Sequence, residues 1–293
     1  MKIKFLLMSM VAAMLVSCGT TSTVPITGRK QYLMVSDGEM LSLSTQQYQE
    51  FMKTAKLSTD ATKTAMVKRV GQNLANAVVS YLNANGMQND VQNYKWQFNL
   101  VADKQANAWC MPGGLIVVYE GLLPITQDEA SLAIVLGHEI AHAVARHSAE
   151  QMSQQMKQQY GVQGVSAVAS ILGVGSNTIS LGQAMASAGL NLANLKYSRN
   201  HESEADYMGL IFAAMAGYNP ESAVSFWQRM SSASTSTTAE FLSDHPSDAT
   251  RIKNIQGWLP EAKKYYKPKT TTTAKKTTTT KKKTTTKKTT TKK

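Results

Sequence analysis

The chain contains two histidines four residues apart, His138 and His142, with Glu139 directly after the first. On a helix, positions four apart lie about 40° from each other around the axis, so both imidazole rings project from one face. That face could bind one zinc ion through two ring nitrogens. Glu139 is turned by about 100° from His138, close enough to polarise a water molecule on the metal. The spacing therefore predicts a metal centre with Glu139 as general base.

The alternative for this helix is a solvated surface on which the two histidines have no ligand. Residues 132–136 read Leu-Ala-Ile-Val-Leu, and Ile140 stands between the histidines. A helix this apolar is expected to be buried, and buried imidazoles need hydrogen-bond or metal partners. The sequence therefore favours the metal centre.

A third ligand is expected from another part of the chain. The extended pattern H-E-x-x-H-x-x-G-x-x-H would need glycine and histidine where this chain has Ala145 and Ser148. His147 comes one position early, and on a continuous helix it points away from the zinc-facing side. We therefore expect His147 beside the ligands or at the surface, and not on the metal.

Residues 202–206, Glu-Ser-Glu-Ala-Asp, are the better source of a third ligand. Glu202 and Asp206 share a helix face, whereas Glu204 lies on the opposite side. Gly209 and Ala213 on the same helix would let a partner helix approach closely. Geometry alone favours Glu202 over Glu204 only modestly, and an exposed, charged helix start is the alternative.

The two motifs together resemble those of the HtpX-like and CAAX-prenyl-protease family of zinc metallopeptidases, which carry H-E-x-x-H and E-x-x-A-D. The resemblance covers residues 24–257 and implies one Zn²⁺ per chain. Three further stretches resemble the exported lipoprotein branch of that family: Asn107-Ala108-Trp109, Pro112-Gly113-Gly114, and Ser-Asp-His-Pro at 243–246. Position by position, the resemblance implies His138, His142 and Glu202 as zinc ligands, Glu139 as general base, and Asp206 as a proton-donating or ligand-supporting residue.

Two other stretches are expected at the site. Asn107, Ala108 and Trp109 could pair with an extended substrate as an added strand beside the zinc. His245 lies in a loop that could reach the zinc, where it would cap the open coordination position or stabilise the oxyanion. The alternative is that His245 only precedes a helix entered through Pro246.

The fold class predicted is α+β and mostly helical, with a zincin-like core and a small β-sheet whose edge strand flanks the zinc-bearing helix. Capping-box patterns at 36–39 and 126–129 open helices expected to reach about residue 55 and, through His147, about residue 158. A further helix is expected over 59–82. Strands are expected at 96–100, 107–110 and 115–119, the middle one at the edge because Pro112 and two glycines follow it.

The next segments are less regular. Residues 161–190 are rich in Gly, Ala and Ser, which predicts two small-residue helices, with a membrane hairpin as the alternative. A helix is expected from about 180 to 216, and Asn219-Pro220 opens another.

The N-terminus has the composition of an export signal. Lys2 and Lys4 precede an apolar run too short to span a bilayer, and Leu15-Val16-Ser17-Cys18 resembles a lipobox. The prediction is a signal peptide over 1–17, lipidation at Cys18, a tether over 18–30 and a peptidase domain over 31–266. Since no aspartate follows Cys18, an outer-membrane lipoprotein facing the periplasm is expected if the cell is Gram-negative. A simple secretory signal is the alternative.

The formal net charge of +12 does not indicate a nucleic-acid-binding body. Ten of the lysines lie in residues 269–293 and two more in the leader, so the body between them is close to neutral. Residues 267–293 contain almost only Lys and Thr and are predicted to be disordered. This tail could also contact an anionic cell-wall or lipid polymer. Cys110 would be the only free thiol, so no intrachain disulfide is available.

The function predicted is a zinc metalloendopeptidase acting on unfolded or misassembled envelope proteins, in quality control. Two other functions remain open: a zinc-bearing, chaperone-like protein that binds such proteins, and an envelope-anchoring protein that works through its tail.

Overall fold

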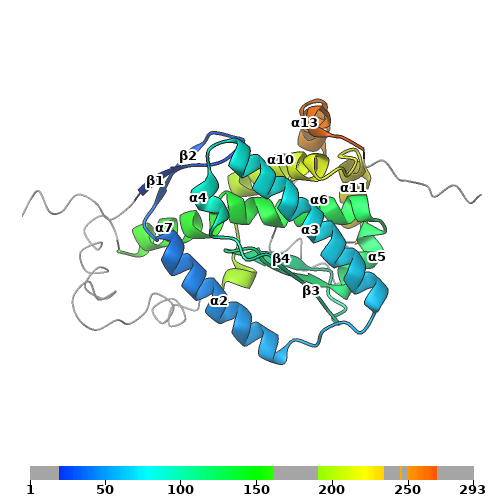
Figure 1. Cartoon of the computed structure of the whole chain (residues 1–293), viewed down its shortest axis with the longest axis horizontal. Helices are drawn as coiled ribbons and strands as arrows, with labels where there is room; N and C mark the ends of the chain where they lie inside the picture. The colour runs from blue at the N-terminus through cyan, green and yellow to red at the C-terminus, as the bar shows by residue number, and fades with distance from the viewer. Residues whose placement is uncertain (1–19, 161–190, 234–244, 246–249, 269–293) are drawn as a thin grey trace, which may run out of the picture.

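A computed structural model describes residues 20–160, 191–233, 245 and 250–268. Within these ranges the chain is mostly helical, with two small sheets, which confirms the α+β prediction (Figure 1). The predicted signal peptide, Cys18, the segment 161–190 and the tail from residue 269 lie outside the described residues. Among the described residues, no helix combines the length and apolar character that crossing a membrane requires.

The central sheet has the strand order β3-β5-β4. β3 (Gln97–Val101) runs parallel to β5 (Leu115–Tyr119), and β4 (Ala108–Met111) runs antiparallel to β5. β4 is therefore an edge strand, as predicted. The turn that follows it uses Gly113 and Gly114 at φ 90° and 82°, and a Cβ on Gly114 would lie 2.4 Å from the Trp96 ring.

Each face of this sheet is covered by helices. One face packs on α3 (Ala61–Ala84) and α6 (Glu129–Val144), through buried residues such as Phe98, Ile116 and Val118, and α10 (Arg199–Met215) packs on these two helices. The other face packs on α2 (Asp37–Thr54), through Trp109 and Val117. Figure 1 shows α6 and α10 stacked above the sheet and α2 below it. This arrangement places the edge strand beside α6.

Helices α6 and α10 touch through their backbones. A Cβ on Gly137 would lie 2.6 Å from the carbonyl oxygen of Gly209, and a Cβ on Gly209 would lie 2.6 Å from the backbone nitrogen of His138. Only glycine permits this approach at either position. The crossing brings the start of α10, with its carboxylates, against the histidines of α6.

The helix predicted to run through His147 is interrupted. α6 ends at Val144, and α7 (His147–Tyr160) begins after Arg146, which has a left-handed φ of 57°. The Arg146 guanidinium is held by Asp37 and Asp90 at 2.9 Å each, so tertiary ion pairs stabilise a backbone angle that arginine rarely adopts. The predicted capping box is also corrected: Asp128, rather than Thr126, caps α6 by accepting from Ser131 N at 2.7 Å.

The tether prediction is wrong for residues 20–30. β1 (Thr20–Thr23) pairs antiparallel with β2 (Lys30–Leu33), and Val24 between them is buried. This hairpin packs on α7. The first described residues are thus folded onto the body, because buried Val24 and the partly buried ion pairs of Arg29 with Glu150 and Glu204 hold them there.

The helices of the second half differ from the prediction at one place. Residues 191–198 form a short 3₁₀ helix, η2 (Leu192–Asn194), and an irregular connection, so the described part of the region expected to be helical over 180–216 is a helix only from Arg199 to Met215. The remaining elements are α4 (Gln88–Val91), η1 (Glu120–Leu122), α5 (Leu123–Thr126), α11 (Ser222–Ala233) and α13 (Arg251–Tyr265).

Candidate metal centre

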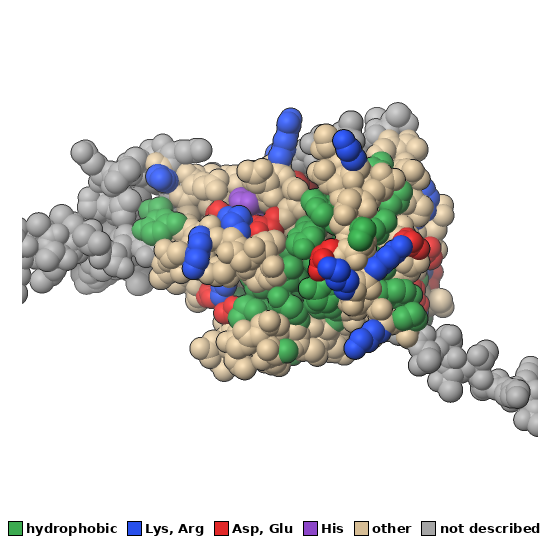
Figure 2. Space-filling model, turned by 90° about the horizontal axis from the view of Figure 1, so that it is seen from above, with side chains coloured by type: hydrophobic (Ala, Val, Ile, Leu, Met, Phe, Trp, Pro, Cys, Tyr) green, Lys and Arg blue, Asp and Glu red, His purple; other side chains and the backbone are tan. Residues whose placement is uncertain are grey.

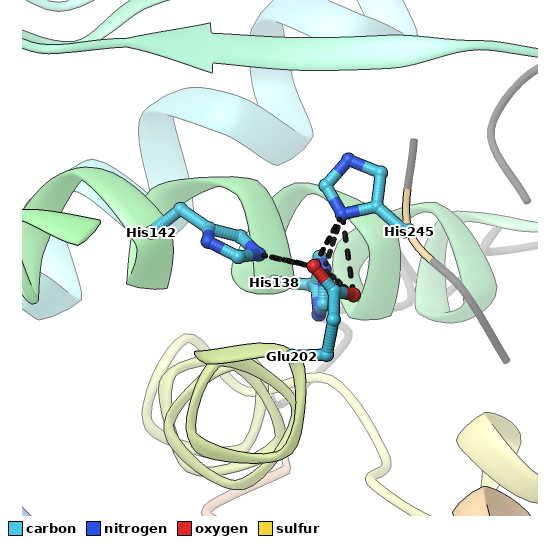
Figure 3. A group of neighbouring side chains, drawn as sticks. All are labelled: His138, His142, Glu202 and His245. Carbon is cyan, nitrogen blue, oxygen red and sulfur yellow. Dashed lines mark hydrogen bonds and ion pairs between the residues drawn. The ribbon is translucent and has the colours of Figure 1, made fainter. Parts of the chain in front are cut away.

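Four buried side chains from three separate parts of the chain converge on one point (Figure 3). His138 and His142 come from α6, Glu202 from the first turn of α10, and His245 from the stretch before α13. One donor atom from each lies within 4.8 Å of the others. We call these four residues the donor group.

The distances within the donor group fit a tetrahedral metal ion. His138 Nε2 lies 3.1 Å from His142 Nε2, and each of these nitrogens lies 3.4 Å from an oxygen of Glu202. His245 Nδ1 lies 3.0 Å from Glu202 Oε1 and 3.2 Å from His138 Nε2. Ligands about 2.0–2.1 Å from a tetrahedral zinc would be roughly 3.3 Å apart. Three nitrogens and one carboxylate oxygen are also donor types that zinc prefers.

The hydrogen bonds around His138 leave a lone pair facing this point. Its Nδ1 lies 2.9 Å from Asp206 Oδ1. Since a carboxylate only accepts, Nδ1 carries the proton and Nε2 is left facing Glu202. A lone pair directed at a buried carboxylate is unfavourable without a cation or a proton between them. The residues present therefore fit a metal ion, and Asp206 sits where the predicted ligand-supporting residue was expected.

The pKa values of the donor group reflect its burial and the charges of its neighbours. Burial lowers the pKa of His138, but the Asp206 and Glu202 carboxylates outweigh it and the net shift is upward. Burial raises the pKa of Glu202, yet His245 and the two ring nitrogens bring it well below its usual value. Burial takes the pKa of His142 well below its ordinary value.

Arg251, which sequence analysis did not identify, closes the side of the site behind Asp206. Its Nη2 donates to Asp206 Oδ1 at 2.6 Å, and its guanidinium lies 3.5 Å from the centre of the Trp227 ring. Nη2 also lies 3.6 Å from Glu202 Oε2. Arg251 therefore fixes the carboxylate that orients His138. A lone arginine in the first turn of a helix carries no sequence signal for such a role.

Glu139 lies beside the donor group without joining it. It is buried, its Oε1 has no hydrogen-bond partner among the described residues, and that oxygen lies 3.5 Å from His245 Nε2. Burial raises the pKa of Glu139 to about 7, although nearby His245 and the backbone N–H of Cys110 favour its charged form. One carboxylate oxygen is thus available as a proton acceptor.

The edge strand flanks α6, but its side chains are not exposed. Asn107, Ala108 and Trp109 are all buried, and Trp109 packs edge-on against Tyr48 and Phe51 of α2. Asn107 O bonds with β5 through Tyr119 N at 3.0 Å. Because backbone groups alternate along an antiparallel strand, those of Ala108 point away from β5. Any strand added here would therefore pair through backbone and not through Trp109.

His142 has two further neighbours. The Tyr197 ring stacks on it, with centroids 4.0 Å apart, and the Tyr197 hydroxyl lies 2.8 Å from Ser148 Oγ. His147 Nδ1 lies 3.0 Å from His142 Nδ1. His147 in turn stacks on His201, so all five histidines of the sequence form one connected cluster. Because the chain has only five histidines, their low number was the sequence signal that could have indicated a shared cluster.

The comparison with known proteins agrees with this site. Residues 61–259, more than half of the chain, match Peptidase family M48, so the chain belongs to that family. Members of this family are metal-dependent peptidases, which agrees with the donor group in α6 and α10. Both segments lie inside the matched range, whereas the β1–β2 hairpin and α2 lie before it.

Three similar proteins illustrate the relationship. The mitochondrial metalloendopeptidase OMA1 of Schizosaccharomyces pombe is 34% identical over 58% of this chain and 48% of its own length. The human mitochondrial metalloendopeptidase OMA1 is 28% identical over 82% of this chain and 46% of its own length. The metalloprotease LoiP of Escherichia coli is 27% identical over 87% of this chain and 96% of its own length. The chain thus spans about half the length of the OMA1 proteins. These relatives support the family, but not specifically the HtpX-like or CAAX members that the motifs resembled.

Proposed function

We propose that this chain is a zinc-dependent endopeptidase that cleaves unfolded or misassembled envelope proteins, in quality control. The observation that supports this most is the donor group of His138, His142, Glu202 and His245, with the carboxylate of Glu139 next to it. A metal that served only a structural role would have no need of a buried, acceptor-ready carboxylate beside it. Two of the similar proteins are metalloendopeptidases by name, which also supports this proposal.

A zinc ion bound here would polarise the peptide carbonyl and lower the pKa of a water molecule. Glu139 would accept a proton from that water through Oε1 and deliver it to the leaving amine. A pKa of about 7 suits both halves of this transfer at neutral pH. Cys110 N–H holds the carboxylate in place, while Asp206 keeps the proton of His138 on Nδ1.

The experiment that tests the activity compares Glu139→Gln with the unaltered protein. Glutamine keeps the size of the side chain but removes the basic oxygen, so zinc content and folding should persist. Turnover of a peptide or of casein should fall by about 10²–10⁴-fold. Glu129→Gln, at the exposed start of the same helix, serves as the matched control and should leave turnover unchanged.

The same variant separates the peptidase from a zinc-bearing, chaperone-like protein. If cleavage is the function, a folded, zinc-loaded Glu139→Gln protein still captures unfolded substrate but does not rescue an envelope defect caused by loss of the gene. Full rescue by that variant would establish the chaperone alternative instead.

We further propose that His245 caps the open coordination position. Catalytic zinc sites keep one position for water or substrate. In this arrangement His245 Nδ1 takes it, 3.0 Å from Glu202 and 3.2 Å from His138. His245→Ala should then raise peptide turnover and increase the affinity for a zinc-binding inhibitor. A fall in turnover would assign His245 to oxyanion stabilisation, and no change in either quantity would remove it from the site.

The location of the protein is also a proposal. The lipobox at 15–18 supports an exported lipoprotein, held at the outer membrane if the cell is Gram-negative. Cys18→Ser should convert a membrane-associated protein into a soluble one, because several acyl chains on one cysteine hold a protein stably. Removing residues 269–293 should leave turnover unchanged, whereas loss of binding to anionic cell-wall polymer would give the tail a role of its own.

A further inference from the structure

The two histidines of the donor group are held from behind by different partners. Asp206 Oδ1 accepts a hydrogen bond from His138 Nδ1 directly, at 2.9 Å. His142 instead faces a second histidine, since its Nδ1 lies 3.0 Å from Nδ1 of His147. His147 Nε2 then lies 3.0 Å from Glu204 Oε2. His142 is therefore linked to a carboxylate through an intervening imidazole.

The direction of the hydrogen bonds in this chain follows from its far end. Glu204 can only accept, so His147 Nε2 carries a proton and donates it. In a neutral ring, Nδ1 of His147 is then an acceptor, and His142 Nδ1 must be the donor. That leaves the Nε2 lone pair of His142 facing His138 and Glu202, which is the tautomer a metal ligand needs.

The carboxylate at the end of the chain is fixed by residues near the N-terminus. Thr27 Oγ1 donates to Glu204 Oε1 at 2.6 Å, and Arg29 Nε donates to Glu204 Oε2 at 2.8 Å. The rest of the Arg29 guanidinium binds Glu150 through two bonds of 2.8 and 2.7 Å. Thr27 and Arg29 belong to the turn between β1 and β2, ahead of the residues that match the family.

We propose that His147 is a positioning residue that fixes the ring orientation and tautomer of His142, and that Thr27 and Arg29 support it through Glu204. The N-terminal hairpin thereby contributes to the affinity of the metal centre. This inference rests on the proposed function only in taking His142 as a metal ligand. Partners of this kind, one step behind a ligand, typically change metal affinity by about 10–100-fold when they are removed.

The test measures the zinc dissociation constant of the full chain by competition with a chelating dye, and the absorption spectrum of the Co²⁺-loaded protein. His147→Leu removes the acceptor and leaves the His142 N–H buried without a partner. Zinc affinity should fall by about 10–100-fold, with a changed Co²⁺ spectrum. His147→Asn places an oxygen where Nδ1 was and should restore affinity to within a few fold of the unaltered protein.

His201→Leu is the matched control. His201 is as buried as His147 and stacks on its ring at 4.5 Å, but its Nε2 faces Glu150, 3.2 Å away, and no member of the donor group. It should lower the stability of the fold without moving the zinc dissociation constant or the Co²⁺ spectrum. Equal losses of affinity in His147→Leu and His201→Leu would reduce His147 to a packing residue.

A milder pair of variants covers the case in which His147→Leu does not fold. Glu204→Gln should weaken zinc binding several-fold in the unaltered background. In the His147→Asn background the same change should have little further effect, because the link between Glu204 and His142 is already broken. Additive effects, or unchanged affinity in His147→Leu, would overturn the inference. An unaltered protein that binds no zinc would instead refute the proposed function, so the two failures are distinguishable.

Discussion

Two buried clusters of histidine and glutamate lie next to each other at the start of α10, and they obtain their positive charge from different sources. The donor group points three ring nitrogens and one carboxylate at a single point. The second, which we call the arginine cluster, consists of Arg29, His147, Glu150, His201 and Glu204. Its two carboxylates are bridged by the guanidinium of Arg29 at 2.7 and 2.8 Å.

The difference indicates what each cluster is for. In the arginine cluster Arg29 pairs with both carboxylates, so their negative charge is balanced without an external ion. The arginine cluster borders a surface cavity of about 500 Å³, which Arg29, Glu150, His201 and Glu204 help to line. On the face of the molecule drawn in Figure 2, a histidine lies among acidic and basic side chains. Arg251 lies beside the donor group, 2.6 Å from Asp206 and 3.6 Å from Glu202. The carboxylates of the arginine cluster thus share an internal cation, whereas the donor group has the donor atoms to bind a metal ion.

The largest expected effect on zinc affinity comes from removing the glutamate of the donor group rather than that of the arginine cluster. Glu202→Ala removes a carboxylate from the donor group, and His138→Ala or His142→Ala removes a nitrogen. Each should lower zinc affinity by more than about 100-fold, beyond the effect of losing a residue behind a ligand. Glu204→Ala should retain one zinc per chain. Metal content after dialysis checks this, and a Glu202→Ala protein with full zinc would move the third ligand to Glu204.

A smaller effect is expected from removing the internal cation of the arginine cluster. Arg29→Met leaves Glu150 and Glu204 facing each other, so the free energy of unfolding should fall by roughly 2–3 kcal/mol. Arg69→Met breaks an exposed pair with Glu129 and should change the free energy of unfolding much less. Urea unfolding measures both. Equal costs would mean that the arginine cluster is no more important to stability than a surface ion pair.

The smallest expected effect is on how the free energy of unfolding depends on pH in the acid range. His201 and Arg29 outweigh burial and lower the pKa of Glu150 to about 2. Because this folded-state pKa lies below the unfolded value, the stabilisation is present above about pH 4.5 and is lost as pH falls toward 2. In the Glu150→Gln protein the decline in unfolding free energy over that window should be shallower by roughly 1 kcal/mol, after allowance for solvent screening. An unchanged slope in urea titrations from pH 5 to pH 3 would contradict it.

Much of the fold could be predicted from local sequence signals. The capping box at Ser36 is present, with Ser36 and Glu39 bonded reciprocally, and α3 begins and ends within about two residues of the expected bounds. The edge position of β4 followed from Pro112 and two glycines after it, but its pairing with β5 did not. These signals depend on neighbours within a few residues, which is why they could be recognised. The β1–β2 hairpin was missed because its short, polar strands have the composition of a linker.

The break between α6 and α7 shows what local signals do not contain. On a continuous helix, positions five apart lie about 140° apart, so His147 would point away from His142. The left-handed Arg146 turns α7 so that the two Nδ1 atoms lie 3.0 Å apart. Neither Ala145 nor Arg146 marks such a turn in sequence. It persists because Asp37 and Asp90, far away along the chain, bind the Arg146 side chain.

The sequence by itself determined the chemistry available to this protein: the helical spacing of His138, Glu139 and His142, and the shared face of Glu202 and Asp206. Helix periodicity fixes those relations wherever the helix lies. Only the tertiary structure decided that His147 contacts His142, that His245 lies beside Glu202 and His138, and that Arg29 and Arg251 hold the carboxylates. Except for the contact between His142 and His147, these contacts join residues more than forty positions apart, and their formation depends on the close crossing of α6 and α10 at Gly137 and Gly209.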